Sequence, residues 1–339
     1  MDFAETEEQQ MIRDMVRDFA ENVAAPTAVE RDRTQQPPVA EFREFAGLGF
    51  AGMAIPEAYG GQKLDDVSEA IVIEELSRVD PSLGVMVAVH VGLCSMTIVL
   101  HGNNAQKEKY LPQLASGETL GAYSLSEAGS GTDAAAMSAK ATDDGDCYVL
   151  NGEKMWVTNG SCADLFVLFA KVNDHPDYGK KKHGGVTAFI IEKGLDGFAV
   201  GKKEDKLGIR ASSTCELIFE NVRLPAANVL GPVGKGYKVA IETLNEGRIG
   251  IGAQMVGDML ADGVVGEVVG IGSVQCQACV VQPDLLPRIE FYEVLSMARF
   301  ESLSPLGSVG LGEPPREGCL PGFTFDSSGK AMVYTEWQW

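Results

Sequence analysis

The stretch Tyr123-Ser-Leu-Ser-Glu-Ala-Gly-Ser-Gly-Thr-Asp133 lies where the chain changes from a helical to a β-rich pattern. Its hydroxyl side chains and glycines supply hydrogen-bond donors without bulk, which suits the polar edge of a flat cofactor or a pyrophosphate. The same composition is also typical of an ordinary Ser/Gly turn in which Asp133 is a local cap. The residues alone leave both interpretations open.

The residues before this stretch predict an all-helical domain over residues 1–118. Thr6 and Gln9 form a capping box, and apolar residues then recur at helical spacing. Residues 81–100 contain no charged side chain and are nearly long enough to span a bilayer. Because this segment also contains serine, glycine and histidine and lacks basic flanks, we expect a helix buried inside a soluble helical domain.

The residues after the stretch predict a β-barrel-like domain over residues 119–228. Short β-rich runs alternate there with Asn, Gly and Asp, at residues 148–150, 166–170, 186–191, 198–200 and 215–219. A Pro/Gly linker follows, and residues 229–256 are expected to begin a second helical domain. The predicted fold class is therefore α+β with several domains.

The pattern changes once more at residue 257. Residues 257–339 show neither a sustained helical period nor a ladder of strands, so the sequence assigns this tail no fold. Its Cys276-Gln-Ala-Cys279 pair has no second such pair and no histidine nearby, which favours chance spacing over a metal site. Seven cysteines at uneven spacing do not predict a disulfide framework, and they favour a reducing compartment.

The charge balance narrows the choice of partners. Acidic residues outnumber basic ones 48 to 28, for a net charge of −20. Non-specific binding to nucleic acid or to an anionic membrane would therefore meet repulsion, and neither partner is expected. The first ten residues carry acids and no basic residue, so no secretory signal or transit presequence is visible.

A second informative stretch is Lys154-Met-Trp-Val-Thr-Asn-Gly160. An aromatic residue followed by a hydroxyl at a strand end can lie against a π-system and hydrogen-bond its heteroatoms. Alternatively, Trp156 is a core anchor of the β-domain. Neither stretch matches a phosphate-binding GxxxxGK[ST] or GxGxxG loop.

Considered together, motifs from Phe3 to about Val256 resemble the acyl-CoA dehydrogenase family, most closely its short/branched-chain type, which acts on 2-methyl-branched acyl-CoA. Besides the two stretches above, the motifs are Glu-Glu-Gln-Gln-Met-Ile-Arg13, Pro-Glu-Ala-Tyr-Gly-Gly61, Gln-Lys-Glu-Lys-Tyr-Leu-Pro112, Lys-Leu-Gly-Ile-Arg-Ala-Ser-Ser-Thr-Cys215 and Leu-Asn-Glu-Gly-Arg248. Jointly they are highly specific.

The resemblance implies FAD as cofactor and an acyl-CoA thioester as substrate. The implied flavin contacts are Tyr123, Leu125, Ser126, Gly131, Thr132, Trp156, Val157 and Thr158. The implied substrate contacts are Thr132, Tyr178, Tyr237, Asn245, Glu246, Gly247 and Arg248. Without the resemblance, Tyr237 and Arg248 would be interpreted as a packed aromatic and a salt-bridged surface arginine. No metal site is expected.

The implied reaction is α,β-dehydrogenation in fatty acid or branched-chain amino acid (isoleucine) catabolism. A carboxylate removes the α-proton while hydride leaves the β-carbon for the flavin. The family passes its electrons to electron-transfer flavoprotein and assembles as homotetramers through the second helical domain. The implied location is the mitochondrial matrix in a eukaryote, or the cytoplasm in a bacterium.

The sequence departs from the family at the catalytic base. The usual base is a glutamate in a Tyr-Glu-Gly-Thr-like loop, and residues 257–339 contain no such loop. Some relatives place the base beside the arginine of the Leu-Asn-Glu-Gly-Arg248 segment, where this chain has Gly247. We therefore leave the catalytic residue unassigned, and expect a nearly inactive enzyme with impaired tetramer assembly and a replaced or aberrant C-terminal tail. The alternatives are a non-catalytic acyl-CoA or partner-binding protein, and an acyl-CoA oxidase of the same fold.

Overall fold

The computed structural model describes residues 4–260, 324–325 and 331–332. The chain divides into two units, residues 1–280 and residues 281–339. In the second unit the described part consists of two short strands, β9 (Thr324–Phe325) and β10 (Ala331–Met332), which pair antiparallel. The expected CxxC pair at Cys276 and Cys279 lies outside the described residues.

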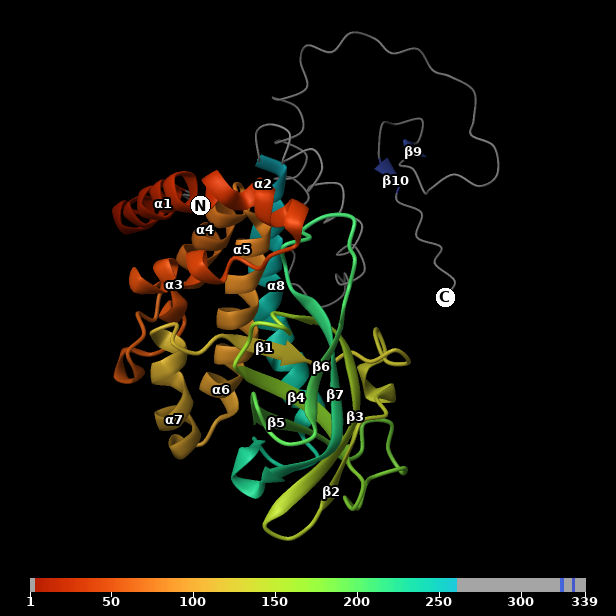
Figure 1. Cartoon of the computed structure of the whole chain (residues 1–339). Helices are drawn as coiled ribbons and strands as arrows, with labels where there is room; N and C mark the ends of the chain where they lie inside the picture. Colours follow the sequence, from red (N-terminus) through yellow and green to blue (C-terminus); the bar gives the residue numbers. More distant parts are fainter. Residues whose placement is uncertain (1–3, 261–323, 326–330, 333–339) are drawn as a thin grey trace, which may run out of the picture. The chain divides into compact units, whose positions relative to one another are not determined.

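All regular elements described before residue 118 are helical (Figure 1), so the expected N-terminal helical domain is confirmed. The capping box forms as predicted: Thr6 accepts a hydrogen bond from the Gln9 backbone, and the Gln9 side chain accepts one from the Thr6 backbone. The elements are α1 (Glu7–Phe19), η1 (Ala20–Ala24), α2 (Ala25–Thr34), α3 (Val39–Gly47), η2 (Phe50–Gly52), η3 (Glu57–Tyr59), α4 (Asp66–Ser77), α5 (Pro81–Ala88), η4 (Val89–Ser95), α6 (Met96–His101) and α7 (Asn104–Ala115).

The apolar segment forms one continuous helix, Pro81–His101, made of α5, η4 and α6. By length and composition it could cross a membrane, and it is the one helix among the described residues that could. However, 61% of its most apolar window is buried inside the protein. Leu83, Val87 and Ile98 are fully buried. This burial agrees with the predicted core helix.

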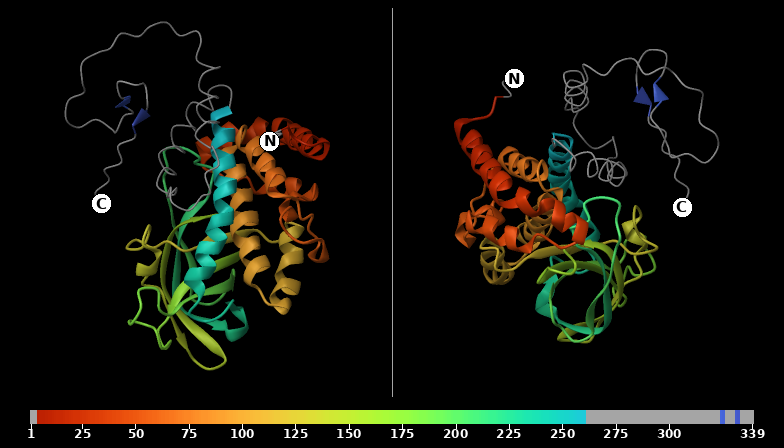
Figure 2. Two further views of the ribbon diagram at one scale, coloured as in Figure 1. Left: turned by 180° about the vertical axis from the view of Figure 1, so that it is seen from behind. Right: turned by 45° about the horizontal axis from the view of Figure 1, so that its top comes forward.

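The middle of the chain forms an eight-stranded sheet that curls strongly (Figure 2). The strands are β1 (Gly121–Ser124), β2 (Lys140–Asp143), β3 (Cys147–Thr158), β4 (Leu165–Val172), β5 (Val186–Glu192), β6 (Phe198–Lys203), β7 (Thr214–Pro225) and β8 (Val229–Leu230). Their order is β6-β7-β3-β2-β4-β5-β8, and β1 pairs with β4 in parallel. The five expected runs lie within β3 to β7, whereas β1, β2 and β8 were not expected.

Two apolar clusters hold the sheet in place. One lies within the curled sheet and includes Phe166, Phe189 and Phe219. The other joins the sheet to the helices, with Phe169 and Ile190 on the sheet side and Leu111 on α7. Strands β4 and β5 are buried on both faces, and their successive side chains point alternately into the two clusters.

The last described helix of this unit is α8 (Gly236–Leu260), which packs along α4, η4 and β5. It starts within the expected residues 229–256 and continues to residue 260, past the boundary expected at residue 257. Helix α8 also contacts α6, where the hydroxyl groups of Thr97 on α6 and Thr243 on α8 lie 3.2 Å apart. A side chain at Gly257 would collide with the backbone carbonyl of Glu74. Glycine is therefore required where α8 approaches α4 most closely.

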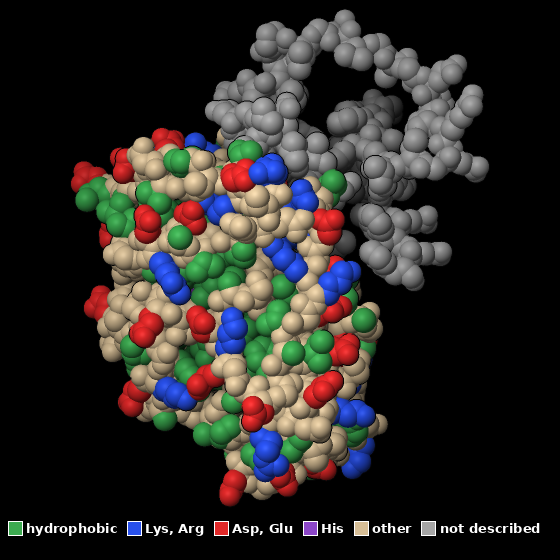
Figure 3. All heavy atoms as spheres, in the orientation of Figure 1, with side chains coloured by type: hydrophobic (Ala, Val, Ile, Leu, Met, Phe, Trp, Pro, Cys, Tyr) green, Lys and Arg blue, Asp and Glu red, His purple; other side chains and the backbone are tan. Residues whose placement is uncertain are grey.

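Charged side chains of both signs are interspersed over the face of the molecule seen in Figure 3. Among the described residues, Cys94, Cys147, Cys162 and Cys215 are free thiols. Burial raises the pKa of Cys94 to about 12, so this thiol stays protonated.

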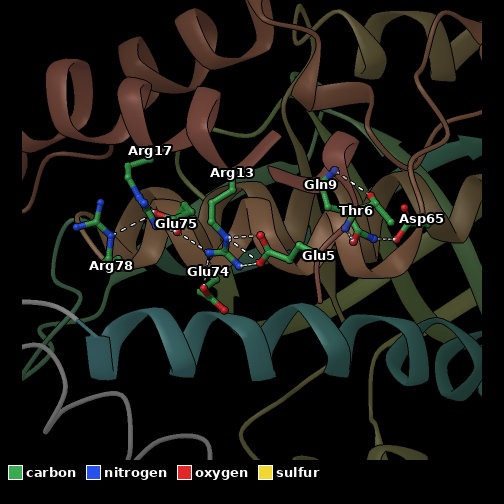
Figure 4. A network of polar contacts seen from close by, with 9 residues as sticks. All are labelled: Glu5, Thr6, Gln9, Arg13, Arg17, Asp65, Glu74, Glu75 and Arg78. Carbon is green, nitrogen blue, oxygen red and sulfur yellow. Dashed lines mark hydrogen bonds and ion pairs between the residues drawn. The ribbon is translucent and has the colours of Figure 1, made fainter. Parts of the chain in front are cut away.

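A buried carboxylate ties α1 to α4 (Figure 4). The side chain of Glu75 is 2% exposed and forms ion pairs with Arg13 at 2.5 Å, Arg17 at 2.8 Å and Arg78 at 3.2 Å. Burial raises the pKa of Glu75, but hydrogen bonds from Arg17 and Arg13 outweigh it and hold the pKa below its usual value. Glu75 is therefore ionised at neutral pH and stabilises the folded chain.

The substitution Glu75→Gln is expected to lower the free energy of unfolding by about 3 kcal/mol at pH 7, because it breaks a buried ionic cluster. The depressed pKa means that this contribution is present above the unfolded-state pKa and is lost as pH falls through the folded-state value. Urea unfolding across this range measures both effects. Glu74→Gln is the control, since Glu74 is more exposed and pairs with Arg13 alone among the residues that the structure describes. Equal losses in the two variants would contradict the role given to Glu75.

Candidate functional site

The structure brings the two informative stretches together. The Met155 backbone N–H donates to the Ser126 carbonyl at 3.0 Å. One residue earlier, the Lys154 ammonium donates to the Leu125 carbonyl at 2.9 Å. The loop after β1 therefore runs along the end of β3, and Ser126 lies beside Trp156.

A buried ion pair between Glu127 and Lys154 holds the loop after β1 against the end of β3; we call this contact the junction. Lys154 Nζ lies 2.7 Å from Glu127 Oε1, and both side chains are almost fully buried. Glu127 also accepts from the Ser138 backbone at 2.5 Å, the Ser138 hydroxyl at 2.7 Å and the Ala139 backbone at 3.1 Å. These bonds satisfy a carboxylate that water does not reach.

The ionisation of the pair follows from its surroundings. Burial lowers the pKa of Lys154 to about 8, although Glu127 opposes that change. Burial raises the pKa of Glu127, but the charge and hydrogen bond of Lys154 hold it below its usual value. Both groups are consequently charged at neutral pH.

Trp156 is not a core anchor, so that interpretation was wrong. Its side chain is 55% exposed, and its backbone has a left-handed φ of 57°, at an irregularity of the β3–β7 pairing between Lys154 and Val157. A bulky residue rarely adopts this conformation, and the surrounding structure must hold it there. The neighbours do so: Val157 is buried, and the Asn159 amide donates to the carbonyls of Met86 and Gly121, each at 3.1 Å.

The other implied flavin contacts fall into three groups by burial. Leu125, Ser126 and Thr158 are half-buried near Trp156, and the hydroxyls of Ser126 and Thr158 have no hydrogen-bond partner within the described residues. Tyr123 and Val157 have buried side chains, and the Tyr123 hydroxyl lies 3.5 Å from the Ala240 carbonyl. Gly131 and Thr132 are exposed on the loop. Asp133 is the N-cap residue of the short helix η5 (Ala134–Ala136), but its side chain makes no capping hydrogen bond and pairs with Lys182 at 3.1 Å.

The implied substrate contacts do not all come together. Tyr178 lines a cavity of about 420 Å³ in the middle domain. Tyr237, half-buried at the start of α8, stacks on His183 with ring centroids 5.3 Å apart. Tyr178 and His183 belong to one loop, so these contacts share a region with Thr132 through the Asp133–Lys182 pair.

The Asn245 to Arg248 segment lies two turns further along α8. Asn245, Glu246 and Arg248 are exposed, and Arg248 donates to the Asn245 side chain. Arg248 forms no ion pair within the described residues, so it is not a salt-bridged surface arginine there.

A smaller cavity of about 40 Å³ lies between α4, η4 and α8, and it is lined in part by Glu69, Glu246 and Gly247. Burial, with the nearby charges of Asp66 and Glu246, raises the pKa of Glu69 to about 7. A Cβ atom at Gly247 would approach Leu93 Cδ2 to 2.5 Å. The carboxyl groups of Glu69 and Glu246 thus lie near Gly247, which is tightly packed against Leu93 and has no side chain.

Sequence reasoning missed Glu127, Lys154 and Glu69. Strand alternation could have found Lys154, because it shares a face of β3 with the buried residues Tyr148 and Leu150. Glu69 carries no comparable signal, since its environment depends on α8, which is distant in sequence. Among the described residues, no group of three or more His, Cys, Asp or Glu lies close enough to hold a metal ion.

Comparison with known proteins supports one family. Residues 6–118 match the family model described as acyl-CoA dehydrogenase, N-terminal domain, and residues 122–222 match acyl-CoA dehydrogenase, middle domain. The chain is 46% identical to the short-chain specific acyl-CoA dehydrogenase of Clostridium acetobutylicum, over 79% of this chain and 69% of that protein. It is 40% identical to the mitochondrial short/branched chain specific acyl-CoA dehydrogenase of Rattus norvegicus, over 74% of this chain and 57% of that one.

Solved structures agree with this result. Butyryl-CoA dehydrogenase from Megasphaera elsdenii matches with a TM-score of 0.73 and 39% identity, over 87% of this chain and 75% of that one. An acyl-CoA dehydrogenase complexed with FAD from Bacillus anthracis matches with a TM-score of 0.69 and 39% identity, over 75% and 42%. A chain in the structure of electron transferring flavoprotein of Acidaminococcus fermentans matches with a TM-score of 0.73 and 45% identity, over 76% and 67%.

The substitution Glu127→Gln is expected to lower the free energy of unfolding by about 3 kcal/mol at pH 7, because it leaves the Lys154 ammonium buried without its carboxylate. The deficit should shrink as pH rises from 7 to 9, because without Glu127 the pKa of Lys154 falls further and releasing the proton of the buried lysine costs less at higher pH. Urea unfolding at pH 7 and pH 9 tests both statements.

The matched control is Glu192→Gln, which breaks the exposed Lys109–Glu192 pair. Its cost should stay below about 1 kcal/mol. The double variant Glu127→Gln with Lys154→Met should recover part of the lost stability. A Glu127→Gln protein as stable as the control would show that the buried pair does not hold the junction.

Proposed function

Because the chain belongs to the acyl-CoA dehydrogenase family, we propose that it is built for flavin-dependent α,β-dehydrogenation of a short or 2-methyl-branched acyl-CoA thioester. The names of its relatives, short-chain and short/branched chain specific, support this substrate class. The observation that carries the proposal is the hydrogen bond between Met155 and Ser126, because it joins the loop and the strand that would hold the cofactor.

The residues at this junction fit FAD. Trp156 offers an exposed aromatic face, and Ser126 and Thr158 offer hydroxyls that no described group engages. We propose that these three, with Leu125, contact the flavin ring, and that Gly131 and Thr132 lie along its polar side. When bound, FAD would accept the hydride that leaves the β-carbon. The protein's own contribution is orientation and exclusion of water.

We propose that Thr132, Tyr178, Tyr237 and the Asn245–Arg248 segment bind the acyl-CoA. Hydrogen bonds to the thioester oxygen are required, because the α-proton is otherwise too weakly acidic for a carboxylate to remove. We propose electron transferring flavoprotein as the electron acceptor, because one of the matching chains comes from a structure of that protein. Relatives occur in bacteria and in mitochondria, so we propose the cytoplasm or the matrix according to the organism.

We further propose that the 339 residues, on their own, turn over acyl-CoA slowly or not at all. No Tyr-Glu-Gly-Thr-like loop occurs in residues 257–339, and the alternative position for the base is Gly247. Glu246 is one residue away, which turns its side chain by about 100° around the helix. Glu69 lies near this position, but nothing assigns it to a thioester.

Flavin binding tests the cofactor assignment. The purified protein, titrated with FAD, should acquire a perturbed flavin absorption spectrum, and Trp156→Ala should weaken binding about tenfold by removing the aromatic contact. Leu207→Ala is the control, because Leu207 is also apolar and exposed. Equal affinity of the two variants would contradict the role of Trp156. Binding of butyryl-CoA by a protein that takes up no FAD would favour the non-catalytic acyl-CoA-binding alternative.

Flavin reduction tests the missing base. With FAD bound, 2-methylbutanoyl-CoA should bleach the flavin of the unmodified chain very slowly. The variant Gly247→Glu combined with Leu93→Ala should bleach it measurably faster, since it adds a carboxyl and removes the methyl group that would lie 2.5 Å from the new Cβ. Leu93→Ala alone is the control. Rapid bleaching by the unmodified chain would overturn the proposed lack of a base.

A further inference from the structure

The cavity of about 420 Å³ in the middle domain has an unusual lining. Five of its residues are lysines, namely Lys140, Lys171, Lys180, Lys181 and Lys182, and Tyr178 also contributes. The whole chain carries a net charge of −20. A cavity with this many ammonium groups therefore reverses the overall charge locally, and its field favours an anion.

Two of the lysines are held together by the sheet. Lys140 on β2 and Lys171 on β4 are direct partners in the parallel register. Like charges placed directly opposite each other on neighbouring strands destabilise a sheet. Neither lysine forms an ion pair within the described part of the chain. An anion bound between them would remove this repulsion.

The remaining three lysines come from the loop between β4 and β5. Lys181 pairs with Asp177 at 2.8 Å and Lys182 with Asp133 at 3.1 Å, whereas Lys180 has no ion-pair partner among the described residues. The loop has a fixed course: a side chain at Gly184 would collide with the Asp177 carbonyl. Lys140, Lys171 and Lys180 thus line the cavity without forming an ion pair among the described residues.

The cavity adjoins the proposed substrate site. Its loop is joined to residue 133, next to Thr132, by the Lys182–Asp133 pair, and to α8 by the stack of His183 on Tyr237. An anionic group that enters the cavity can therefore belong to a molecule that also reaches Thr132 and Tyr237. Several phosphate charges at one end of an otherwise neutral chain match this layout.

We propose that the lysine cavity binds the phosphate groups at the nucleotide end of a CoA thioester, and that Lys140, Lys171 and Lys180 select such thioesters over those that lack the 3′-phosphate. This inference rests on the proposed function. Ammonium groups bind phosphate as point charges and do not require the planar fork of arginine. The cavity is expected to favour thioesters with the 3′-phosphate, because a ligand that lacks this group does not relieve the repulsion between Lys140 and Lys171.

Equilibrium binding tests the inference without turnover. Titration calorimetry compares butyryl-CoA, butyryl-dephospho-CoA and butyryl-pantetheine. The unmodified chain should bind butyryl-CoA about tenfold more tightly than the dephospho compound, as expected for loss of charge-assisted hydrogen bonds. The affinity for butyryl-CoA should fall steeply with salt.

The variant Lys140→Gln with Lys171→Gln should bind butyryl-CoA and butyryl-dephospho-CoA with equal affinity. Lys180→Gln, which lies on the loop and does not disturb the sheet, should lose part of the discrimination. Lys202→Gln is the matched control, since it removes an exposed lysine from β6 of the same sheet, and it should keep the full tenfold preference. Equal affinity of the unmodified chain for both thioesters would overturn the inference, as would unchanged discrimination in the double variant.

Two further measurements separate this inference from the proposed function. If the protein binds FAD and butyryl-CoA but ignores the 3′-phosphate, the lysine inference fails while the proposed function stands. Adenosine 3′,5′-bisphosphate alone should raise the Tm of the unmodified chain but not that of the double variant. If this shift occurs although neither FAD nor butyryl-CoA binds, the phosphate site is supported and the acyl-CoA function is overturned; a shift of equal size in the double variant overturns the assignment to these lysines.

Discussion

The buried ion pair between Glu127 and Lys154 is the interaction on which the candidate site depends. Neither charge can be buried alone without a cost of several kcal/mol. Each is therefore tied to the other at 2.7 Å, and with them the loop after β1 is tied to the end of β3. The same lysine holds the Leu125 carbonyl, and the next residue, Met155, holds the Ser126 carbonyl. This anchoring lets Trp156 keep a left-handed backbone and an exposed ring, because both of its flanks are fixed.

The helices and most strands could be predicted because their signals are local. The capping box of Thr6 and Gln9 and the β-rich runs within β3 to β7 follow from side chains close in sequence. The short strands β1, β2 and β8 could not be predicted in this way. Lys140 to Asp143, for example, has little strand propensity of its own and exists as a strand because β3 and β4 pair with it. Tertiary pairing, and not local preference, creates these elements.

The candidate site shows the same division. That the two stretches would lie together followed from their resemblance to a family, but the exposure of Trp156 did not, since an aromatic residue on a strand packs inward as readily as outward. The pKa of Glu69 is raised mainly by burial, and the charge of Glu246 adds to this, although the two residues are 177 positions apart in the chain. Hydrophobic periodicity in the sequence does not predict that these two side chains lie close together. Lys140 and Lys171 likewise lie opposite each other because of the register between β2 and β4, which the sequence does not reveal.

Close packing and the proposed proton abstraction place opposite demands on position 247 of α8. Gly92 on η4 lies against Gly247, and Leu93 occupies the space that a side chain at 247 would need. The absence of a Cβ atom at both glycines lets the two helices approach closely, which strengthens their contact. A glutamate at 247 would supply a carboxyl near Glu69, in a setting that already raises a carboxyl pKa to about 7, as suits a general base. It would also push Leu93 away and weaken the close packing. At this position the chain therefore has the residue that favours the fold and lacks the one that would favour proton abstraction.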